Sequence, residues 1–479
     1  MADLLGLMKI LLLLCYLATW AAVPHLLFLK KRPAATLAWL WAILFIPFLG
    51  TLVYGLFGTD RLKRRRLKHR AKFSAGSSRQ RPPASATDEA TAVSIRNLPG
   101  RERQFLQLLS RINQLPSSSA EELRILLDAQ EFYPALEQRI REAKRSIHLE
   151  FYIWRSDETG GRFLRLLADA AQRGVKVRLL LDGVGSFGLR RRQLNDFRAA
   201  GGRLAWFQGL DPRRGRFALN LRNHRKLQII DNAVAFVGGM NIGREHEGLD
   251  PLSGHWRDVQ VEAVGSVVQA LQEVFADDWF FATGEKIPEP PATVHRAAYP
   301  MHVLVGGADR ANEPMSKSIV SLLHEATSRV WIATGYFVPD DVLLAALELA
   351  ASRGVDVRLL VAEKSDHWWL VIVGRSYYEE LLAAGVRIFE YSAGTNHAKV
   401  TVADEHWGLV GSANLDYRSM RLNFELNLLV RSPEHNAELT RILEHYFELS
   451  REIEPAAFAR RPFRQRWAEA ALRPLSPML

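Results

Sequence analysis

The stretch "NHRKLQIID" (residues 223–231) carries a histidine, a lysine and an aspartate at fixed spacing on an expected β-strand. Alternation along the strand places His224, Lys226 and Gln228 on one face and the apolar residues on the other. An imidazole and an ammonium group side by side are unfavourable on a buried strand, so we expect this pair to face an anionic group. One histidine seldom completes such a site, which predicts a second half elsewhere in the chain.

The second half lies in "NHAKVTVAD" (residues 396–404), which repeats the spacing H-x-K-x4-D. The six motif residues are His224, Lys226 and Asp231 in the first copy and His397, Lys399 and Asp404 in the second. In both copies an asparagine, Asn241 or Asn414, stands seventeen residues after the histidine. One such motif is a weak signal, but two with matching surroundings indicate a duplicated unit.

The similarity between the two copies extends well beyond the motifs. The matching pairs are "RGVKVRLLLD" (173–182) with "RGVDVRLLVA" (353–362), "FVGGMN" (236–241) with "LVGSAN" (409–414), and "HWRDVQV" (255–261) with "LNFELNL" (422–428). The last pair aligns Asp258 with Glu425. Each copy alternates apolar strands with helical patterns such as "GGRFLRLLADAAQRG" (160–174), which predicts an α/β/α sandwich in each repeat.

Two apolar stretches near the N-terminus, residues 10–29 and 34–57, are joined only by "KKRP". Crossing a bilayer core takes about 20 apolar residues, so the pair predicts a two-helix transmembrane hairpin. A cleaved signal peptide is the alternative for the first stretch, but the second stretch follows it at once.

The net charge of +11 is concentrated just after the second stretch. Ten Lys and Arg residues and no acidic residue lie between Arg61 and Arg81. The positive-inside rule then places everything C-terminal to the hairpin in the cytoplasm. Two interpretations of this cluster stay open: it binds anionic lipid headgroups, or it serves only to fix the membrane topology. The rest of the chain is nearly neutral, which argues against a nucleic-acid partner.

The expected organisation therefore has six parts. They are a transmembrane hairpin (1–60), a basic juxtamembrane linker (61–92), the first repeat (93–285), a Pro-rich linker (286–300), the second repeat (301–455) and a basic tail (456–479). The tail, with Phe463 and Trp467 among its basic residues, could lie on a membrane surface or pack on the domain.

Two histidines and two lysines gathered in one pocket suit a phosphodiester. One histidine can attack phosphorus and form a covalent intermediate, while the other donates and accepts the proton. Lysines and asparagines stabilise the charge that spreads in the transition state. Asp258 and Glu425 are candidates for fixing the tautomer of an imidazole. No metal or cofactor is expected, since the chain has a single cysteine and no HExxH, Walker or Rossmann pattern.

With these motifs the sequence resembles the phospholipase D superfamily, and within it the bacterial cardiolipin synthases. The resemblance covers nearly the whole chain and rests on both motifs, "VGGMNIG" (237–243), "GSANLDYRSMRLNFELNLL" (411–429) and the N-terminal "AWLWAILFIPFLGTLVYGLFG" (38–58). It implies one active site shared by two phospholipase D-like repeats in a multi-pass protein of the bacterial inner membrane. It also implies phosphatidyl transfer, in which two phosphatidylglycerols give cardiolipin and glycerol.

The resemblance also implies roles for individual residues. His224 would be the nucleophile and His397 the acid and base, with both motif lysines in the catalytic core. Asn241 and Asn414 would contact the phosphate. The motif aspartates would mainly brace the fold. One departure is Gly335 in "TGYFVPDD", where the family pattern has proline.

Other functions stay open at this stage. They are a phospholipase D-type hydrolase that uses water, a transferase that uses another alcohol such as ethanolamine, a membrane-tethered nuclease, and a scaffold without activity. The remaining histidines, such as His148, His255 and His406, have no repeat partner and are expected to be structural.

Overall fold

The computed structural model describes residue 6 and residues 16–17, 19–28, 33–54, 88–207, 221–248, 254–288, 296–310, 313–365 and 367–478. Contacts divide the chain into two compact units, Met1–Lys68 with Leu210–Asn220, and His69–Gly209 with Leu221–Leu479. The larger unit holds both copies of the repeat, and the smaller unit holds the N-terminal helices.

The first repeat forms a seven-stranded mixed sheet among the described residues. In spatial order its strands are β2 (Glu122–Leu127), β9 (Val259–Val264), β7 (Val234–Gly238), β6 (Leu227–Ile230), β3 (Ser146–Phe151), β4 (Lys176–Asp182) and β5 (Arg203–Phe207). The pairings from β2 to β3 are antiparallel, and those from β3 to β5 are parallel.

In the part of the chain that the structure describes, the second repeat forms a nine-stranded sheet. Its strands are β1 (Ser118–Ala120), β10 (Tyr299–Val305), β19 (Leu426–Arg431), β17 (Trp407–Gly411), β16 (Val400–Ala403), β11 (Arg329–Thr334), β13 (Asp356–Ala362), β14 (Arg387–Tyr391) and β20 (Ser450–Glu452). From β10 to β14 the order and directions match those of the first sheet, which confirms the predicted α/β duplication.

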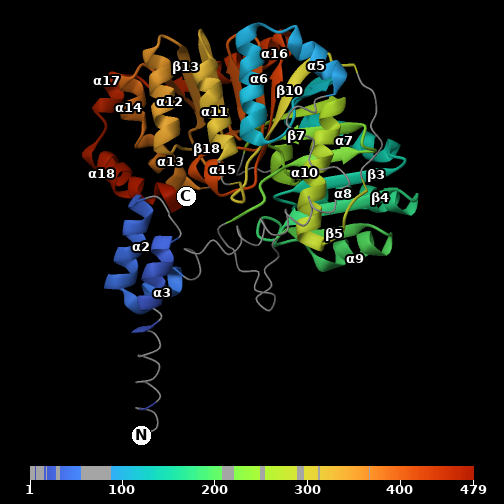
Figure 1. The fold of residues 1–479 in the computed structure, drawn as a ribbon, viewed down its shortest axis with the longest axis horizontal. Coiled ribbons are helices and arrows are strands. Elements are labelled where there is room, and N and C mark those ends of the chain that lie inside the picture. Colours follow the sequence, from blue (N-terminus) through green and yellow to red (C-terminus); the bar gives the residue numbers. More distant parts are fainter. Residues whose placement is uncertain are drawn as a thin grey trace. The chain divides into compact units, whose positions relative to one another are not determined.

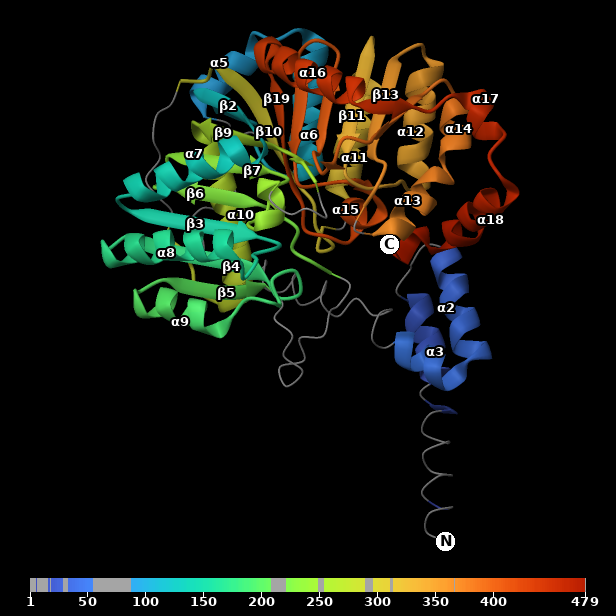
Figure 2. The same ribbon diagram turned by 180° about the vertical axis from the view of Figure 1, so that it is seen from behind.

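Helices cover both faces of each sheet (Figures 1 and 2). The first sheet has α7 (Asp128–Glu142), α8 (Glu158–Gln172) and α9 (Arg191–Ala199) on one face and α10 (Ser266–Thr283) on the other. The second has α6 (Gly100–Asn113), α11 (Pro314–Glu325), α12 (Asp341–Ser352) and α14 (Tyr378–Ala383) on one face and α16 (Pro433–Glu448) on the other.

The shorter elements of the larger unit complete the chain path. They are α5 (Glu89–Arg96), η3 (Arg244–Glu247), β8 (Trp256–Arg257), β12 (Phe337–Val338), α13 (Trp368–Arg375), β15 (Thr395–Asn396), β18 (Leu415–Asp416), α15 (Tyr417–Arg421), α17 (Pro455–Ala459), α18 (Phe463–Leu472) and η4 (Arg473–Met478).

Local signals in the sequence set where the crossover helices begin. The Asp157 carboxylate accepts the Gly160 N–H at the start of α8, and the Asp340 carboxylate accepts the Leu343 N–H at the start of α12. Such caps satisfy backbone donors that have no partner within the helix. Behind them, Phe132 and Phe163 are fully buried between the first sheet and its helices. Truncating either to Ala would cost roughly 3–5 kcal/mol.

A segment that precedes the first sheet belongs by packing to the second. Strand β1 pairs with β10 in antiparallel register, Ser118 opposite Met301. Helix α6 places Phe105, Leu106 and Leu109 in the core of the second repeat. The chain therefore starts its larger unit against the second sheet and only then enters the first.

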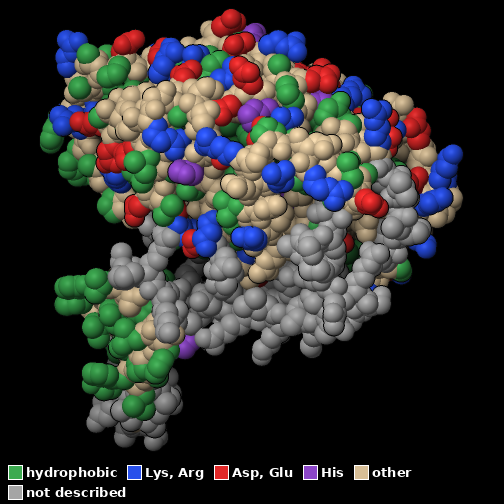
Figure 3. All heavy atoms as spheres, turned by 45° about the horizontal axis from the view of Figure 1, so that its top comes forward, with side chains coloured by type: hydrophobic (Ala, Val, Ile, Leu, Met, Phe, Trp, Pro, Cys, Tyr) green, Lys and Arg blue, Asp and Glu red, His purple; other side chains and the backbone are tan. Residues whose placement is uncertain are grey.

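The N-terminal helices pack on one another within the smaller unit. The Thr19 and Thr51 hydroxyls lie 3.1 Å apart, and His25 Nδ1 lies 2.8 Å from the Tyr54 hydroxyl. The same segments expose large apolar side chains, including Trp20, Phe28 and Trp41. Figure 3 shows hydrophobic side chains gathered over these helices.

The expected second span is interrupted in the structure. Helix α2 (Pro33–Phe45) ends before Ile46, whose φ of −128° is not helical, and α3 (Pro47–Val53) follows. The residue before a proline is disfavoured in the α conformation, which explains the break. No helix in the described part of the chain is both long and apolar enough to span a membrane. Parts of both predicted spans, residues 10–15, 18, 29 and 55–57, lie outside the described residues, as does the basic segment 61–81.

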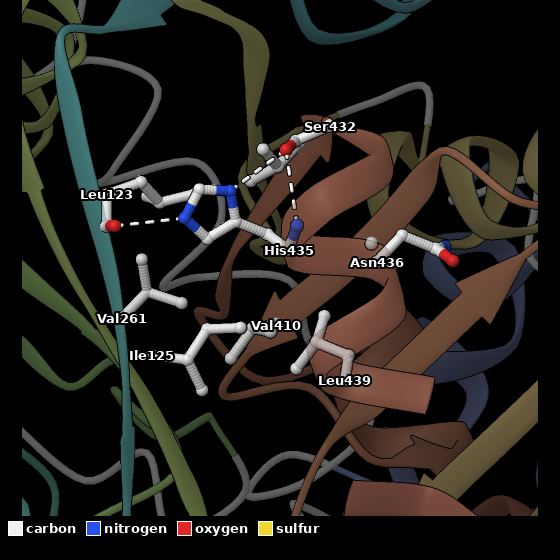
Figure 4. Close-up of a pocket in the computed structure, with 10 residues that line it drawn as sticks. Leu123, Ile125, Val261, Val410, Ser432, His435, Asn436 and Leu439 are labelled. Atoms are coloured by element: carbon white, nitrogen blue, oxygen red, sulfur yellow. Dashed lines mark hydrogen bonds between the residues drawn. The ribbon is translucent and has the colours of Figure 1, made fainter. Parts of the chain in front are cut away.

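The two repeats meet along a seam where β7 and β9 face β17 and β19. His435 of α16 crosses this seam, since its Nε2 lies 2.9 Å from the Leu123 carbonyl oxygen while its Nδ1 lies 2.9 Å from Ser432 Oγ. Figure 4 shows the small apolar hollow beside it, lined by side chains such as Ile125, Val261 and Leu439. None of the motif residues lines this hollow, so it is packing space and a different place from the candidate site.

Candidate active site

His224 and Lys226 lie just before a regular strand and not within it. We expected a strand over residues 223–231, but β6 begins at Leu227. The preceding residues pair across the seam instead: the His224 N–H donates to the Phe424 carbonyl at 2.9 Å, next to a parallel bridge between Asn223 and Phe424. The irregular backbone directs the imidazole of the first repeat toward the second.

The second motif is built in the same way. His397 lies between β15 and β16, and its N–H donates to the Arg257 carbonyl at 2.8 Å. Here the flanking parallel pair joins Thr395 to Trp256 and Asn396 to Arg257. Each histidine is thus held by the backbone of the other repeat, at the residue just before the acid that the internal repeat aligns, Asp258 or Glu425.

The acids themselves are exchanged between the repeats. His224 Nδ1 lies 3.0 Å from the carboxylate of Glu425, and His397 Nδ1 lies 2.6 Å from Asp258 Oδ2. Both carboxylates are fully buried. A carboxylate can only accept here, so Nδ1 of each ring carries the proton and Nε2 is left for chemistry. The two candidates for orienting the imidazoles therefore both contact a motif histidine.

The electrostatics of the two pairs differ. Burial lowers the pKa of His224 against the opposing effect of Glu425. For Glu425, burial alone would raise the pKa, but His224 and Lys226 outweigh it and the pKa is lowered. Burial raises the pKa of Asp258 to about 6 in spite of Lys399. His224 is thus a neutral imidazole beside an ionised carboxylate at neutral pH.

Both motif lysines are buried and turned back toward their own histidine. Lys226 Nζ donates to the His224 carbonyl at 2.7 Å, and Lys399 Nζ donates to the His397 carbonyl. Burial lowers the pKa of Lys226 to about 7, and Lys399 acts in the same direction. Two lysine side chains brought together beside the paired imidazoles would suit a bound phosphate.

The side-chain oxygens of the paired asparagines differ in their hydrogen bonding. Asn241 Oδ1 accepts the Ile153 N–H at 3.1 Å. Asn414 Oδ1 is buried and has no hydrogen-bond partner among the residues that the structure describes. A Cβ on Gly335 would lie 3.4 Å from Asn414 Oδ1 and 3.4 Å from the Cα of His397, so Gly335 lies at the edge of the site.

The motif aspartates lie at the opposite ends of their strands and do not reach the imidazoles. Asp231 accepts the backbone N–H groups of Lys144, Arg145 and Ser146 at 2.7 to 2.8 Å. Asp404 likewise accepts from the segment that opens β11, including the Ser328 N–H at 2.8 Å. Each carboxylate pins the start of the neighbouring strand. The bracing role that the resemblance implied for them stays a prediction.

Several neighbours of the site were not predicted from the sequence to be site residues. Ser412 donates its hydroxyl to Glu425, and the Asp258 N–H donates to Asp128 Oδ1 at 2.8 Å. The Tyr152 ring lies 5.0 Å from that of His224, centroid to centroid. Only Tyr152 left a signal, because the second repeat carries Tyr336 at the corresponding place.

Comparison with known proteins gives two family matches. Residues 136–279 and 319–447 match the family described as "Cardiolipin synthase, PLD-like domain", and residues 17–58 match "Phospholipase_D-nuclease N-terminal". The cardiolipin synthase of Geobacillus thermodenitrificans is 37% identical over 460 residues, which cover 94% of this chain and 90% of that protein. Cardiolipin synthase A of Pseudomonas syringae pv. syringae is 35% identical over 448 residues, 91% of each chain.

Among solved structures, the phosphatidylserine synthase of Haemophilus influenzae Rd KW20 has a similar fold. Its TM-score is 0.60 at 15% identity, and the match covers 78% of this chain and 100% of that one. At this identity the likeness concerns the fold alone.

Proposed function

The chain belongs to the cardiolipin synthase family of phospholipase D-like proteins, and on that premise we propose that it transfers a phosphatidyl group between two phosphatidylglycerols, giving cardiolipin and glycerol. One observation carries the proposal: each motif histidine is hydrogen-bonded to a buried carboxylate from the other repeat. This arrangement provides two oriented imidazoles for one reaction.

In the first step His224 acts as the nucleophile. Its Nε2 attacks phosphorus, a nitrogen–phosphorus bond forms, and the bond from phosphorus to the glycerol oxygen breaks. His397, protonated on Nε2, gives its proton to the departing glycerol. The lowered pKa of His224 supports this order, because the ring that attacks must be neutral.

In the second step the roles of His397 reverse. Its neutral Nε2 takes the proton from a headgroup hydroxyl of the second phosphatidylglycerol, whose oxygen attacks phosphorus and releases His224. Lys226 and Lys399 offset the negative charge on the phosphoryl oxygens in both steps, and the amides of Asn241 and Asn414 donate hydrogen bonds to them. These side-chain roles need no metal ion.

We also propose that the enzyme is held at the cytoplasmic face of the bacterial inner membrane by a two-helix hairpin. The family match over residues 17–58 supports an N-terminal membrane region. So do the ten basic residues between Arg61 and Arg81, which follow the positive-inside rule. On the larger unit, α18 exposes Phe463 and Trp467 beside arginines, a composition suited to a lipid surface. We propose the same six-part organisation of the chain that the sequence predicts.

A product assay tests the reaction. Purified protein receives labelled phosphatidylglycerol as the sole lipid in mixed micelles, and the products are separated, with His224→Ala as the inactive control. We expect cardiolipin and free glycerol. Phosphatidic acid alone would make water the acceptor and the protein a hydrolase. Transfer only after ethanolamine is added would point to a different alcohol as the acceptor.

A further inference from the structure

A third histidine lies next to the paired motifs and has no role in the steps above. His246, in the short helix η3, is 2% exposed. Neither of its ring nitrogens has a hydrogen-bond partner in the part of the chain that the structure describes. The repeat pattern does not single out His246, because Ser419 stands at the corresponding place in the second repeat.

His246 belongs to a cluster of three rings that ends at His397. The centroid of its ring lies 6.1 Å from that of His397 and 4.7 Å from that of Trp256, which in turn lies 5.3 Å from His397. The indole Nε1 of Trp256 is also buried without a partner among the described residues. Two side chains that pack near the proposed acid and base thus carry three nitrogens without a hydrogen-bond partner among the described residues.

Leaving such atoms unpaired is costly. A buried donor or acceptor without a partner loses its hydrogen bonds to water and gains none in return, so three together favour a polar ligand that would pair with them. A neutral imidazole offers one donor and one acceptor, and an indole offers one donor. A hydroxyl both donates and accepts, so a pair of neighbouring hydroxyls matches this set.

The charges around the cluster disfavour a cation. Burial lowers the pKa of His246 well below its usual value, with His397, Lys226 and Arg155 acting in the same direction and Asp258 opposing them. The carboxylates of η3 are engaged elsewhere: Glu245 pairs with Arg155, and Glu247 pairs with Arg162. Asp258 is bonded to His397. An ammonium headgroup would therefore find no uncommitted carboxylate on these elements.

We propose that His246 and Trp256 form the alcohol subsite, which binds the hydroxyls of glycerol as it leaves and of the glycerol headgroup as it arrives at His397. This inference rests on the proposed function and deepens it, since it names the ligand class as a neutral vicinal diol. In the transfer step, a hydroxyl held here gives its proton to His397 Nε2 while its oxygen bonds phosphorus and the bond from phosphorus to His224 breaks. His246 and Trp256 position the alcohol, and His397 moves the proton.

The test separates formation of the covalent intermediate from its partitioning. The donor is phosphatidyl-p-nitrophenol in mixed micelles, whose nitrophenolate leaves without needing a proton. A burst of nitrophenolate reports the phosphatidyl-enzyme, and glycerol and water then compete for it to give phosphatidylglycerol or phosphatidic acid. Ethanolamine replaces glycerol in a parallel series.

We expect His246→Phe and Trp256→Phe to keep the burst within about twofold and to lower the ratio of phosphatidylglycerol to phosphatidic acid roughly tenfold. Transfer to ethanolamine falls less than transfer to glycerol. His246→Asn, which restores a donor and an acceptor, recovers part of the ratio. His324→Phe, on an exposed histidine, is the matched control and changes nothing.

An unchanged ratio in both variants would overturn the subsite. So would loss of the burst in a variant whose melting temperature matches that of the unsubstituted protein, because the cluster would then serve the first step. A burst that persists in His224→Ala would instead count against the proposed function itself. Trp256→Phe keeps the test decisive where His246→Phe fails to fold.

Discussion

The imidazole of His397 is hydrogen-bonded to Asp258, a residue of the other repeat, with 2.6 Å between Nδ1 and Oδ2. We expect Asp258→Asn to lower kcat by about 10²–10⁴-fold, because an amide does not hold the Nδ1–H tautomer or stabilise an imidazolium. Steady-state transfer assays measure this effect. Asp196→Asn, on an exposed aspartate of α9, is the control. A loss smaller than tenfold would mean that the pair is structural.

The assignment of His224 as the nucleophile predicts different behaviour for the two histidine variants. With a nitrophenyl phosphodiester donor, no general acid is needed in the first step. His397→Ala should therefore still accumulate a phosphatidyl-enzyme, while His224→Ala should not. Acid quenching with a donor labelled in the phosphatidyl group, followed by gel separation, detects the adduct. If the His224→Ala protein became labelled instead, His397 would be the nucleophile and His224 the acid and base.

Lys226 should make the folded protein less stable at neutral pH than at alkaline pH. Its pKa is lowered to about 7 in the folded state, whereas an unfolded lysine titrates near 10.4. Between these values the unfolded state binds more protons, so stability rises with pH across that window. Lys226→Met should stabilise the protein by on the order of 3 kcal/mol at pH 7, and the gain should shrink toward pH 10.

Thermal unfolding of the full chain in detergent from pH 6 to pH 10 measures this gain. Lys317→Met, on an exposed lysine of α11, is the control and should show no such trend. A melting-temperature difference between Lys226→Met and the unsubstituted protein that does not vary with pH would contradict the linkage.

Asp404 should matter for stability far more than for turnover. Asp404→Ala leaves the N–H groups of Thr327, Ser328 and Arg329 without their acceptor, at a cost of roughly 2–4 kcal/mol. The pKa of Asp404 is lowered, although burial opposes the shift, through hydrogen bonds from Ser328 and its neighbours. The contribution is thus present above about pH 4 and lost as the pH falls through the folded-state pKa.

Chemical denaturation at pH 7 and pH 3.5 checks this expectation, with Glu405→Ala as the neighbouring exposed control. At low temperature the kcat of Asp404→Ala should exceed that of His397→Ala by at least a hundredfold. Equal losses of kcat would assign Asp404 to the chemistry.

The sequence predicted the duplication and the chemistry because both depend on residue types at repeated spacing. Aligning the copies also found Asp258 and Glu425. It could not reveal that each acid serves the other repeat's histidine, because that depends on how the two sheets meet. For the same reason the sequence could not predict the pairing of β1 with β10, in which Ser118 lies opposite Met301.

Other features could not be predicted from the sequence, for local reasons. The strand expected over residues 223–231 begins only at Leu227, because the histidine segment bonds across the seam to Phe424. Pro47 interrupts the second apolar stretch although its composition is uniformly hydrophobic. His246 and Trp256 belong to no repeated pattern, so only their placement beside His397 singles them out.

The exchange of acids also determines when, during its own synthesis, the protein can first act. Glu425 follows His224 by 201 residues, so the ribosome has translated most of the second repeat before the first histidine meets its carboxylate. His397 itself emerges long after Asp258. Under the proposed mechanism, a nascent or prematurely terminated chain that ends before residue 425 lacks the carboxylate that orients His224, and it is expected to be inactive.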